Sequence, residues 1–80
     1  MDELMRNTIS DYIGSTILKQ PGRKIDPDEP LLSSGLIDSF NLVDFAIFLE
    51  KEFNVRIDDT ELFPQVFDNI NQLIQLIHTK

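Results

Sequence analysis

Residues 39–53 read SFNLVDFAIFLEKEF, and their apolar residues recur at helical spacing. On a helical wheel at about 100° per residue, one arc holds the side chains that can be buried together, namely Leu42, Phe45, Ala46, Leu49 and Phe53. A second apolar group, Phe40, Val43 and Ile47, points to the opposite side, together with the charged residues Asp44, Glu50 and Lys51. We therefore expect a helix that buries the first group and leaves part of the second exposed.

The chain before this helix predicts one further helix and a long loop. Residues 2–18 place apolar side chains at spacings of three and four, from Leu4 onward, and Pro21-Gly22 ends the helix. Residues 19–38 then contain three prolines and two glycines. So long a segment without structure is unusual unless it is functional or holds a turn of its own. We expect Leu31 and Leu32 to form an apolar turn that holds this loop against the core.

Two capping signals mark helices in the C-terminal part of the chain. Asp58 and Glu61 have the spacing of a capping box, which predicts a short helix that Pro64 ends. Asn69 is a favourable N-cap for a last helix that extends to His78 with an apolar stripe. No segment alternates with a period of two, so no strand is expected. The expected fold class is all-α, a small bundle of three main helices and one short helix.

Composition excludes several classes of function. The 80 residues include 14 acidic and 7 basic side chains, a formal net charge of −7. This charge argues against nucleic acid and anionic membranes as partners and favours a basic protein. Cysteine is absent, so neither a disulfide nor a thiolate metal site can form. His78 alone cannot build a zinc site, and we expect it to be a solvated residue at a helix end.

Length and hydropathy indicate one domain, residues 1–80, in the cytoplasm. No apolar run is long enough to span a membrane, and the N-terminus, Met1-Asp2-Glu3, is acidic where a signal peptide needs positive charge. A chain of this size has room for one small core.

The helix over residues 39–53 begins at Asp38-Ser39, a pair that in most proteins is only an N-cap. Here it belongs to a longer string, LSSGLIDSF at residues 32–40, followed by Leu42-Val43 and by LEKEF at residues 49–53. Together these residues resemble the attachment-site signature of acyl carrier proteins, and the resemblance covers nearly the whole chain. Fatty-acid carriers usually have Gly-x-Asp-Ser-Leu. The Gly-Leu-Ile-Asp-Ser form found here is more similar to D-alanyl and other stand-alone specialised carrier proteins.

The resemblance implies an acyl-carrier-like four-helix bundle with a long first loop. It implies that Ser39 receives a 4′-phosphopantetheine group from coenzyme A, delivered by a separate phosphopantetheinyl transferase that recognises Asp38. The thiol of this arm then holds an acyl or aminoacyl group as a thioester, so the chain is a monomeric, non-catalytic carrier. The implied partners are the transferase, an acyl- or aminoacyl-loading ligase and downstream acyltransferases of lipid or secondary-metabolite biosynthesis.

The resemblance also implies a role for the second apolar group of the helix. Phe40, Val43 and Ile47 fall where such carriers meet their enzymes, inside a rim of acidic residues that steer basic partners, namely Asp44, Glu50, Asp58, Asp59 and Glu61. Gly35 is expected to have a positive φ, with Leu36 and Ile37 anchoring the end of the loop beside the core or a bound acyl chain. The alternative to a docking surface is that Phe40 lies under the loop and Val43 is a lone exposed valine.

Two other functions remain to be considered. The chain could be a helical interaction adaptor that carries no prosthetic group, with Asp38-Ser39 acting only as a cap. A hydrolase that uses Ser39 as its nucleophile is disfavoured, because no base is paired with this serine in the sequence.

Overall fold

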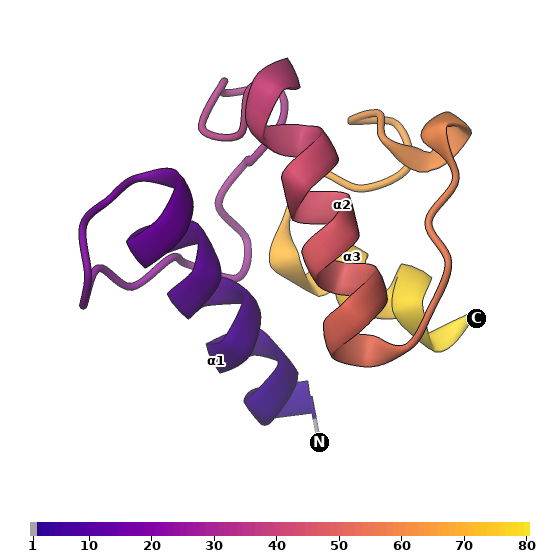
Figure 1. Ribbon diagram of the computed structural model, residues 1–80, viewed down its shortest axis with the longest axis horizontal. Helices are drawn as coiled ribbons and strands as arrows, with labels where there is room; N and C mark the ends of the chain where they lie inside the picture. Colours follow the sequence, from indigo (N-terminus) through magenta and orange to yellow (C-terminus); the bar gives the residue numbers. More distant parts are fainter. Residues whose placement is uncertain (1) are drawn as a thin grey trace.

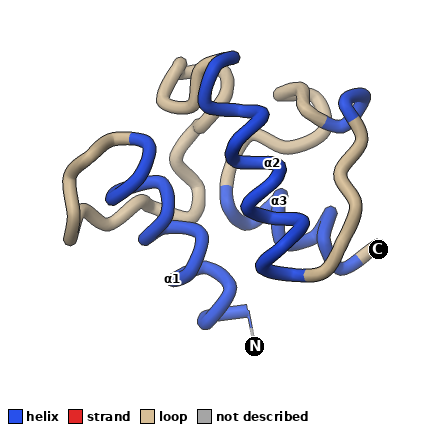
Figure 2. Tube along the Cα trace, viewed as in Figure 1, coloured by secondary structure: helices blue, strands red, loops and turns tan. Residues whose placement is uncertain are grey.

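The computed structural model describes residues 2–80, and that part of the chain contains helices and no strand. The elements are α1 (Asp2–Tyr12), the π-helical turn η1 (Ile13–Ile17), α2 (Ser39–Phe53), the 3-10 turn η2 (Asp59–Glu61) and α3 (Ile70–His78). In Figure 1, α2 crosses the front of the molecule, with α1 beside it and α3 behind it, and Figure 2 shows how much of the remainder is loop. The all-α prediction is confirmed. No helix within the described residues has the length and apolar character needed to cross a bilayer.

The predicted short helix is only a 3-10 turn of three residues, so the fold has three α-helices. The capping box itself is present, since the Asp58 side chain accepts from the third residue and Glu61 accepts from the Asp58 amide. Phe63 precedes Pro64 and is therefore disfavoured in an α conformation. Too few residues separate Asp58 from Phe63 for a second helical turn to form.

The first helix changes its character after Tyr12 instead of remaining α-helical to Leu18. It continues as a π-helical turn, and the chain then leaves the helix at Lys19, whose φ is 56°. The carbonyl of Gly14 in the wide turn accepts from the Gln20 amide at 2.7 Å. A Cβ atom on Gly14 would lie 2.8 Å from the Arg23 carbonyl oxygen. The glycine therefore lets the start of the long loop pass directly over the helix.

The core is formed by one face of each helix. On α2 the predicted face is confirmed: Phe45, Ala46 and Leu49 are buried, and Leu42 and Phe53 pack partly buried against them. The rings of Tyr12 and Phe48 stack with centroids 3.9 Å apart and join α1 to α2, while α1 also packs against α3.

The expectation that Leu4 belongs to the buried face of the first helix is wrong, because its side chain is 69% exposed. Leu4 precedes Ile9 by five positions, which turns it about 140° away from that buried residue at about 100° per residue. Ile9 and Ile13 are fully buried, as expected for the core face.

The long loop between α1 and α2 is held in place by buried and polar contacts. Leu31 is fully buried and Leu32 half-buried, which confirms the predicted apolar turn. Ser10 of α1 accepts from the Ile25 amide at 2.9 Å. Asn71 of α3 donates to the Asp28 carboxylate, also at 2.9 Å. The loop is therefore an ordered part of the structure that both outer helices support.

The C-terminal residues are paired with other parts of the chain. His78 is exposed in the last turn of α3, as predicted, and its Nε2 atom also lies 2.8 Å from Asp2 Oδ1. Lys80 Nζ lies 2.6 and 2.7 Å from the two carboxylate oxygens of Glu61. The C-terminal residues are thus joined to α1 by a hydrogen bond and to η2 by an ion pair. Met1, which the sequence interpretation placed in an acidic N-terminus, lies outside the described residues.

Candidate functional site

Ser39 is the first residue of α2, and its side chain is exposed. The preceding residue, Asp38, is the N-cap: its carboxylate accepts from the Asn41 amide at 2.9 Å, and its carbonyl accepts from the Leu42 amide at 2.9 Å. The predicted capping role of Asp38 is confirmed. Within residues 2–80 no side-chain hydrogen bond involves the Ser39 hydroxyl, which projects from the start of the helix.

The surroundings of Ser39 fit a phosphate ester. The amide groups in the first turn of a helix have no acceptor within the helix, and the helix dipole is positive at this end. A phosphate attached to the Ser39 oxygen would therefore lie in a favourable field beside donors that it can use. Because the neighbouring Asp38 carboxylate is already bonded to Asn41, it is turned toward the backbone of its own helix.

The chain approaches Ser39 through a tightly bonded turn. Gly35 has a φ of 81°, as predicted, and its amide donates to the Leu32 carbonyl at 3.2 Å. The Ile37 amide donates to the Leu31 carbonyl at 3.0 Å, and the Ile37 side chain is buried while that of Leu36 is half-buried. The predicted packing of these two residues is therefore confirmed.

The sequence interpretation did not identify Asp68, which lies directly before α3 and holds this turn by hydrogen bonds. Its Oδ1 atom accepts from the amides of Leu31, Leu32 and Ser33 at 3.1, 2.7 and 2.9 Å, and its Oδ2 atom accepts from the Ser33 hydroxyl. Burial raises the pKa of this carboxyl, but the hydrogen bonds from Ser33, Leu32 and Leu31 outweigh that effect and hold the pKa below its ordinary value. The only local signal is an aspartate next to the N-cap Asn69, which does not reveal partners 35 to 37 residues away.

The second apolar group of α2 forms an exposed surface that starts beside Ser39, and we call it the α2 stripe. Phe40 is 88% exposed, Val43 58% and Ile47 43%, so Phe40 does not lie under the loop. Asp44 is exposed on the side of the stripe toward α1. Burial of Tyr12 on α1, with a further contribution from the Asp44 charge, raises the pKa of the tyrosine hydroxyl.

Two exposed apolar side chains that the sequence interpretation missed, Phe63 and Val66, lie in the segment between η2 and α3. This segment does not form a helix in which a periodicity could have marked them.

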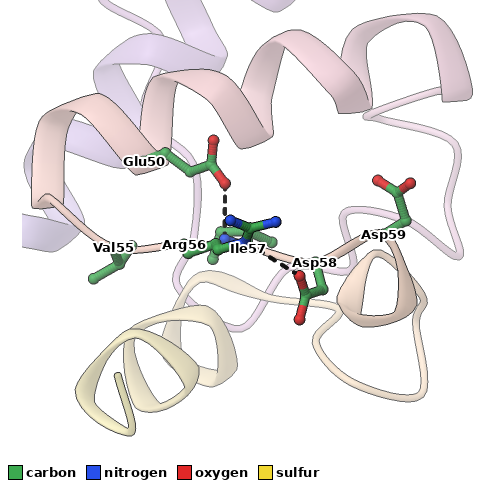
Figure 3. A pocket seen from close by; sticks show the side chains of 6 residues that line it. All are labelled: Glu50, Val55, Arg56, Ile57, Asp58 and Asp59. Carbon is green, nitrogen blue, oxygen red and sulfur yellow. Dashed lines mark hydrogen bonds and ion pairs between the residues drawn. The ribbon is translucent and has the colours of Figure 1, made fainter.

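Most of the predicted acidic rim is engaged in structural contacts. Glu50 is half-buried, and its Oε2 atom accepts from the Ile57 amide at 2.9 Å, as Figure 3 shows. Asp58 lies 3.6 Å from the Arg56 guanidinium. The Glu61 carboxylate receives hydrogen bonds from Lys80 and from the Asp58 amide, and these hold its pKa below the ordinary value. Asp44 and Asp59 remain as exposed carboxylates with no side-chain hydrogen bond or ion pair to residues 2–80.

Figure 3 also shows that Glu50, Arg56 and Asp58 line an open hollow of about 570 Å³, together with Val55, Ile57 and Asp59. Across residues 2–80 no three histidine, cysteine or carboxylate side chains converge in a way that could hold a metal ion.

Comparison with protein families shows to which family the chain belongs. Residues 7–77 match the family described as "Phosphopantetheine attachment site". The chain belongs to this family. It is a member of the acyl carrier proteins, and its prosthetic group is a covalently attached 4′-phosphopantetheine. The family and the cofactor predicted from the sequence are thus confirmed, while the roles of individual site residues remain predictions.

A curated protein and a solved structure are also similar to this chain. The carrier is 29% identical to a D-alanyl carrier protein of Bacillus licheniformis over 55 residues, which cover 69% of this chain and 70% of that protein. It is also similar to a chain in a solved structure described as "Crystal structure of FAD-dependent dehydrogenase". The identity there is 28% and the TM-score 0.75, with 86% of this chain and 97% of that chain covered.

Proposed function

We propose that Ser39 is the attachment site of the 4′-phosphopantetheine group, and that the carrier presents acyl or aminoacyl groups on this arm to partner enzymes. The observation that supports this most directly is the exposed Ser39 hydroxyl at the N-terminus of α2, directly after the N-cap residue Asp38. Both residues lie within the part of the chain that matches the family. When bound, the group supplies a thiol that holds the cargo as a thioester. We further propose that residues 1–80 form a single carrier domain.

The attachment step needs a base that this chain does not place beside Ser39. The serine oxygen forms a bond to the phosphorus atom that bears the pantetheine arm of coenzyme A. The bond from that phosphorus to the bridging pyrophosphate oxygen breaks, and adenosine 3′,5′-bisphosphate leaves. Because within residues 2–80 no side chain is hydrogen-bonded to the Ser39 hydroxyl, the transferase has to accept its proton. We propose that Asp38 contributes by fixing the start of α2 and by forming part of the surface that the transferase recognises.

The α2 stripe is the surface on which we propose that partner enzymes dock. An enzyme that uses an arm attached at Ser39 has to approach the start of α2, where Phe40 projects farthest into solvent. Burying Phe40, Val43 and Ile47 would provide binding free energy. Among the acidic residues, Asp44 is the one best placed to steer a basic partner, because Glu50 is bonded to the Ile57 amide.

The relatives suggest what these partners are. The similarity to a D-alanyl carrier protein favours an aminoacyl cargo and an aminoacyl-loading ligase. The similarity to a chain of the dehydrogenase structure makes a flavin dehydrogenase acting on the tethered group a second candidate partner. A phosphopantetheinyl transferase and downstream acyltransferases complete the proposed set.

Intact-mass measurement tests the proposed attachment site. Incubation with coenzyme A and a broad-specificity phosphopantetheinyl transferase should add one phosphopantetheine group to the wild-type chain and none to Ser39→Ala. Ser15→Ala is the matched control, because Ser15 is also exposed but lies on η1, and this variant should load like the wild type. A Ser39→Ala chain that still gains the group would overturn the assignment. A wild-type chain that never gains it would favour the adaptor without a prosthetic group.

A further inference from the structure

Asp68 lies immediately before the N-cap of α3, yet it makes its side-chain bonds to the loop before α2. Three amides in succession, those of Leu31, Leu32 and Ser33, point at one oxygen of its carboxylate, and the Ser33 hydroxyl reaches the other. The Asp68 carbonyl also accepts from the Leu31 amide at 2.6 Å. Hydrogen bonds to a charged acceptor are stronger than neutral ones, so this carboxylate is the main polar support of the turn.

Asp68 is itself held firmly. Its amide donates to the Gln72 side-chain oxygen at 2.7 Å, and the Asn69 side chain next to it caps α3 by accepting from the Gln72 amide at 2.7 Å. Phe67 on its other side is fully buried. The carboxylate is therefore fixed relative to the first turn of α3.

A continuous series of hydrogen bonds leads from this turn to the start of α2. The amides of Gly35, Leu36 and Ile37 donate to the Leu32 carbonyl, the Ser34 hydroxyl and the Leu31 carbonyl at 3.2, 3.3 and 3.0 Å. The next residue is Asp38, the N-cap, and Ser39 follows. The amides of Gly35 and Ile37 are thus bonded to residues that Asp68 binds, while the Leu36 amide is bonded to Ser34, whose hydroxyl donates to the Pro30 carbonyl at 2.6 Å.

We propose that Asp68 is a positioning residue for modification of this carrier: it holds residues 31–37 in the conformation in which Ser39 is presented to the transferase. This inference rests on the proposed attachment at Ser39. Without the carboxylate, the exposed segment Ser33–Gly35 loses its main support, and the approach to Ser39 adopts several conformations. The transferase would then bind only the fraction of molecules that have the competent one.

A smaller competent fraction has a specific kinetic signature. The apparent dissociation constant rises in inverse proportion to that fraction, while the bound complex reacts as before. We therefore expect Asp68→Asn to raise the KM for the carrier in phosphopantetheinylation roughly three- to tenfold and to leave kcat within about twofold of the wild type. Amide hydrogen exchange at Leu31, Leu32, Ser33 and Ile37 should accelerate in the same variant, with exchange at Leu49 and Leu73 in the core unchanged.

The experiment uses the full chain, coenzyme A and a broad-specificity transferase, with initial rates followed by intact mass over a range of carrier concentrations. Asp11→Asn is the matched control, because it removes the same charge from an exposed position on α1 where the carboxylate has no hydrogen bond or ion pair within residues 2–80. Ser33→Ala is the milder variant. It removes one of the bonds to Asp68 and should raise KM by a smaller factor than Asp68→Asn.

Each outcome decides between the alternatives. A wild-type KM in Asp68→Asn, whatever its melting temperature, overturns the inference, because Asp68 would then have only a structural role. An equal rise in Asp11→Asn also overturns it and assigns the effect to net charge. If Asp68→Asn does not fold, Ser33→Ala decides, and a wild-type KM there is a negative result. A wild-type chain that is not modified at Ser39 overturns the proposed function as well as this inference. If the wild type is modified and Asp68→Asn has the same KM, only this inference is overturned.

Discussion

Phe40 and Phe45 lie on the same helix, yet one projects into solvent and the other is fully buried in the core. The difference follows from the five positions between them, which turn one ring about 140° away from the other at about 100° per residue. The same residue type therefore has two different roles on α2. Phe45 contributes to the stability of the fold, while Phe40 adds apolar surface beside the proposed attachment site.

This pair gives the first prediction. Phe45→Ala should lower the free energy of unfolding by about 3–5 kcal/mol, because it removes a ring and leaves a cavity in a small core. Phe40→Ala should change it by less than about 0.5 kcal/mol, as is usual for an exposed site. Urea denaturation followed by circular dichroism measures both. Equal stabilities of the two variants would mean that the faces of α2 are assigned the wrong way round.

At the scale of single residues, what the sequence can predict depends on the distance to the partner along the chain. Asp38 is recognisable as a cap because its partner, the Asn41 amide, is three residues away. Gly35 is recognisable because turn chemistry is local. Asp68 makes more hydrogen bonds than either, but all its side-chain partners come from residues 31–33. Only the folded chain shows which loop this carboxylate meets.

The helix α2 has one buried face and one exposed apolar face. Its buried face packs in the core with residues of α1 and α3, and the α2 stripe is exposed. Because the stripe starts beside Ser39, any partner that reaches the arm has to come near it. If partners dock on the α2 stripe as proposed, substitutions on the two faces of this helix should affect stability and recognition separately.

The second prediction tests this separation. The double variant Val43→Ser, Ile47→Ser should have a melting temperature close to that of the wild type, because both side chains lie on the exposed face of α2 and outside the core. Loading by the transferase or by a cargo ligase should become slower, because the apolar contact area is lost. Melting and loading are measured on the same protein, with Leu49→Ser as the control that disrupts the buried face. A double variant that melts far lower would place these residues in the core, and one that loads like the wild type would place the docking surface elsewhere.

The ends of helices can be predicted from the sequence where a capping residue sets them. They cannot be predicted where tertiary contacts set them. The start of α2 after Asp38 and the start of α3 after Asn69 agree with the prediction, because each cap bonds an amide within its own first turn. The end of the first helix was predicted from Pro21-Gly22. The structure instead widens the helix at residues 13–17, where Gly14 packs against the backbone near Arg23. That close approach belongs to the loop, so helical periodicity could not indicate it.

At the scale of the whole molecule, carboxylates join segments that are distant in sequence. Asp2 pairs with His78, Glu61 with Lys80, and Asp68 with the loop before α2. The hydrogen bond to His78 is the leading cause that lowers the pKa of Asp2, and the pKa values of Glu61 and Asp68 are also lowered. The chain has a net charge of −7. Three of its carboxylates thus stabilise contacts between segments that are distant in sequence.

The last prediction concerns how the contribution of the Asp68 contact to stability changes at acidic pH. A carboxyl whose pKa is lower in the folded state contributes stability that is fully present above its ordinary pKa and is lost as the pH falls through the folded value. For Asp68 the ordinary pKa is 3.8 and the folded value lies below it. Acid also relieves the repulsion among the many negative charges. The melting temperature of the wild type alone would therefore mix two opposing effects.

The difference in melting temperature between wild type and Asp68→Asn isolates the contribution of this one carboxyl. We expect this difference in melting temperature to be constant from about pH 7 to about pH 5. It should shrink as the pH falls below about 4, because Asp68 of the wild type then becomes protonated and loses its charge. Asp11→Asn, which removes an unbonded carboxylate, should show no comparable narrowing. A gap for Asp68→Asn that stays constant through the acid range would mean that the amides of residues 31–33 bind the neutral carboxyl as well as the charged one. In that case hydrogen bonds that do not depend on the negative charge of Asp68 would hold the loop in front of Ser39.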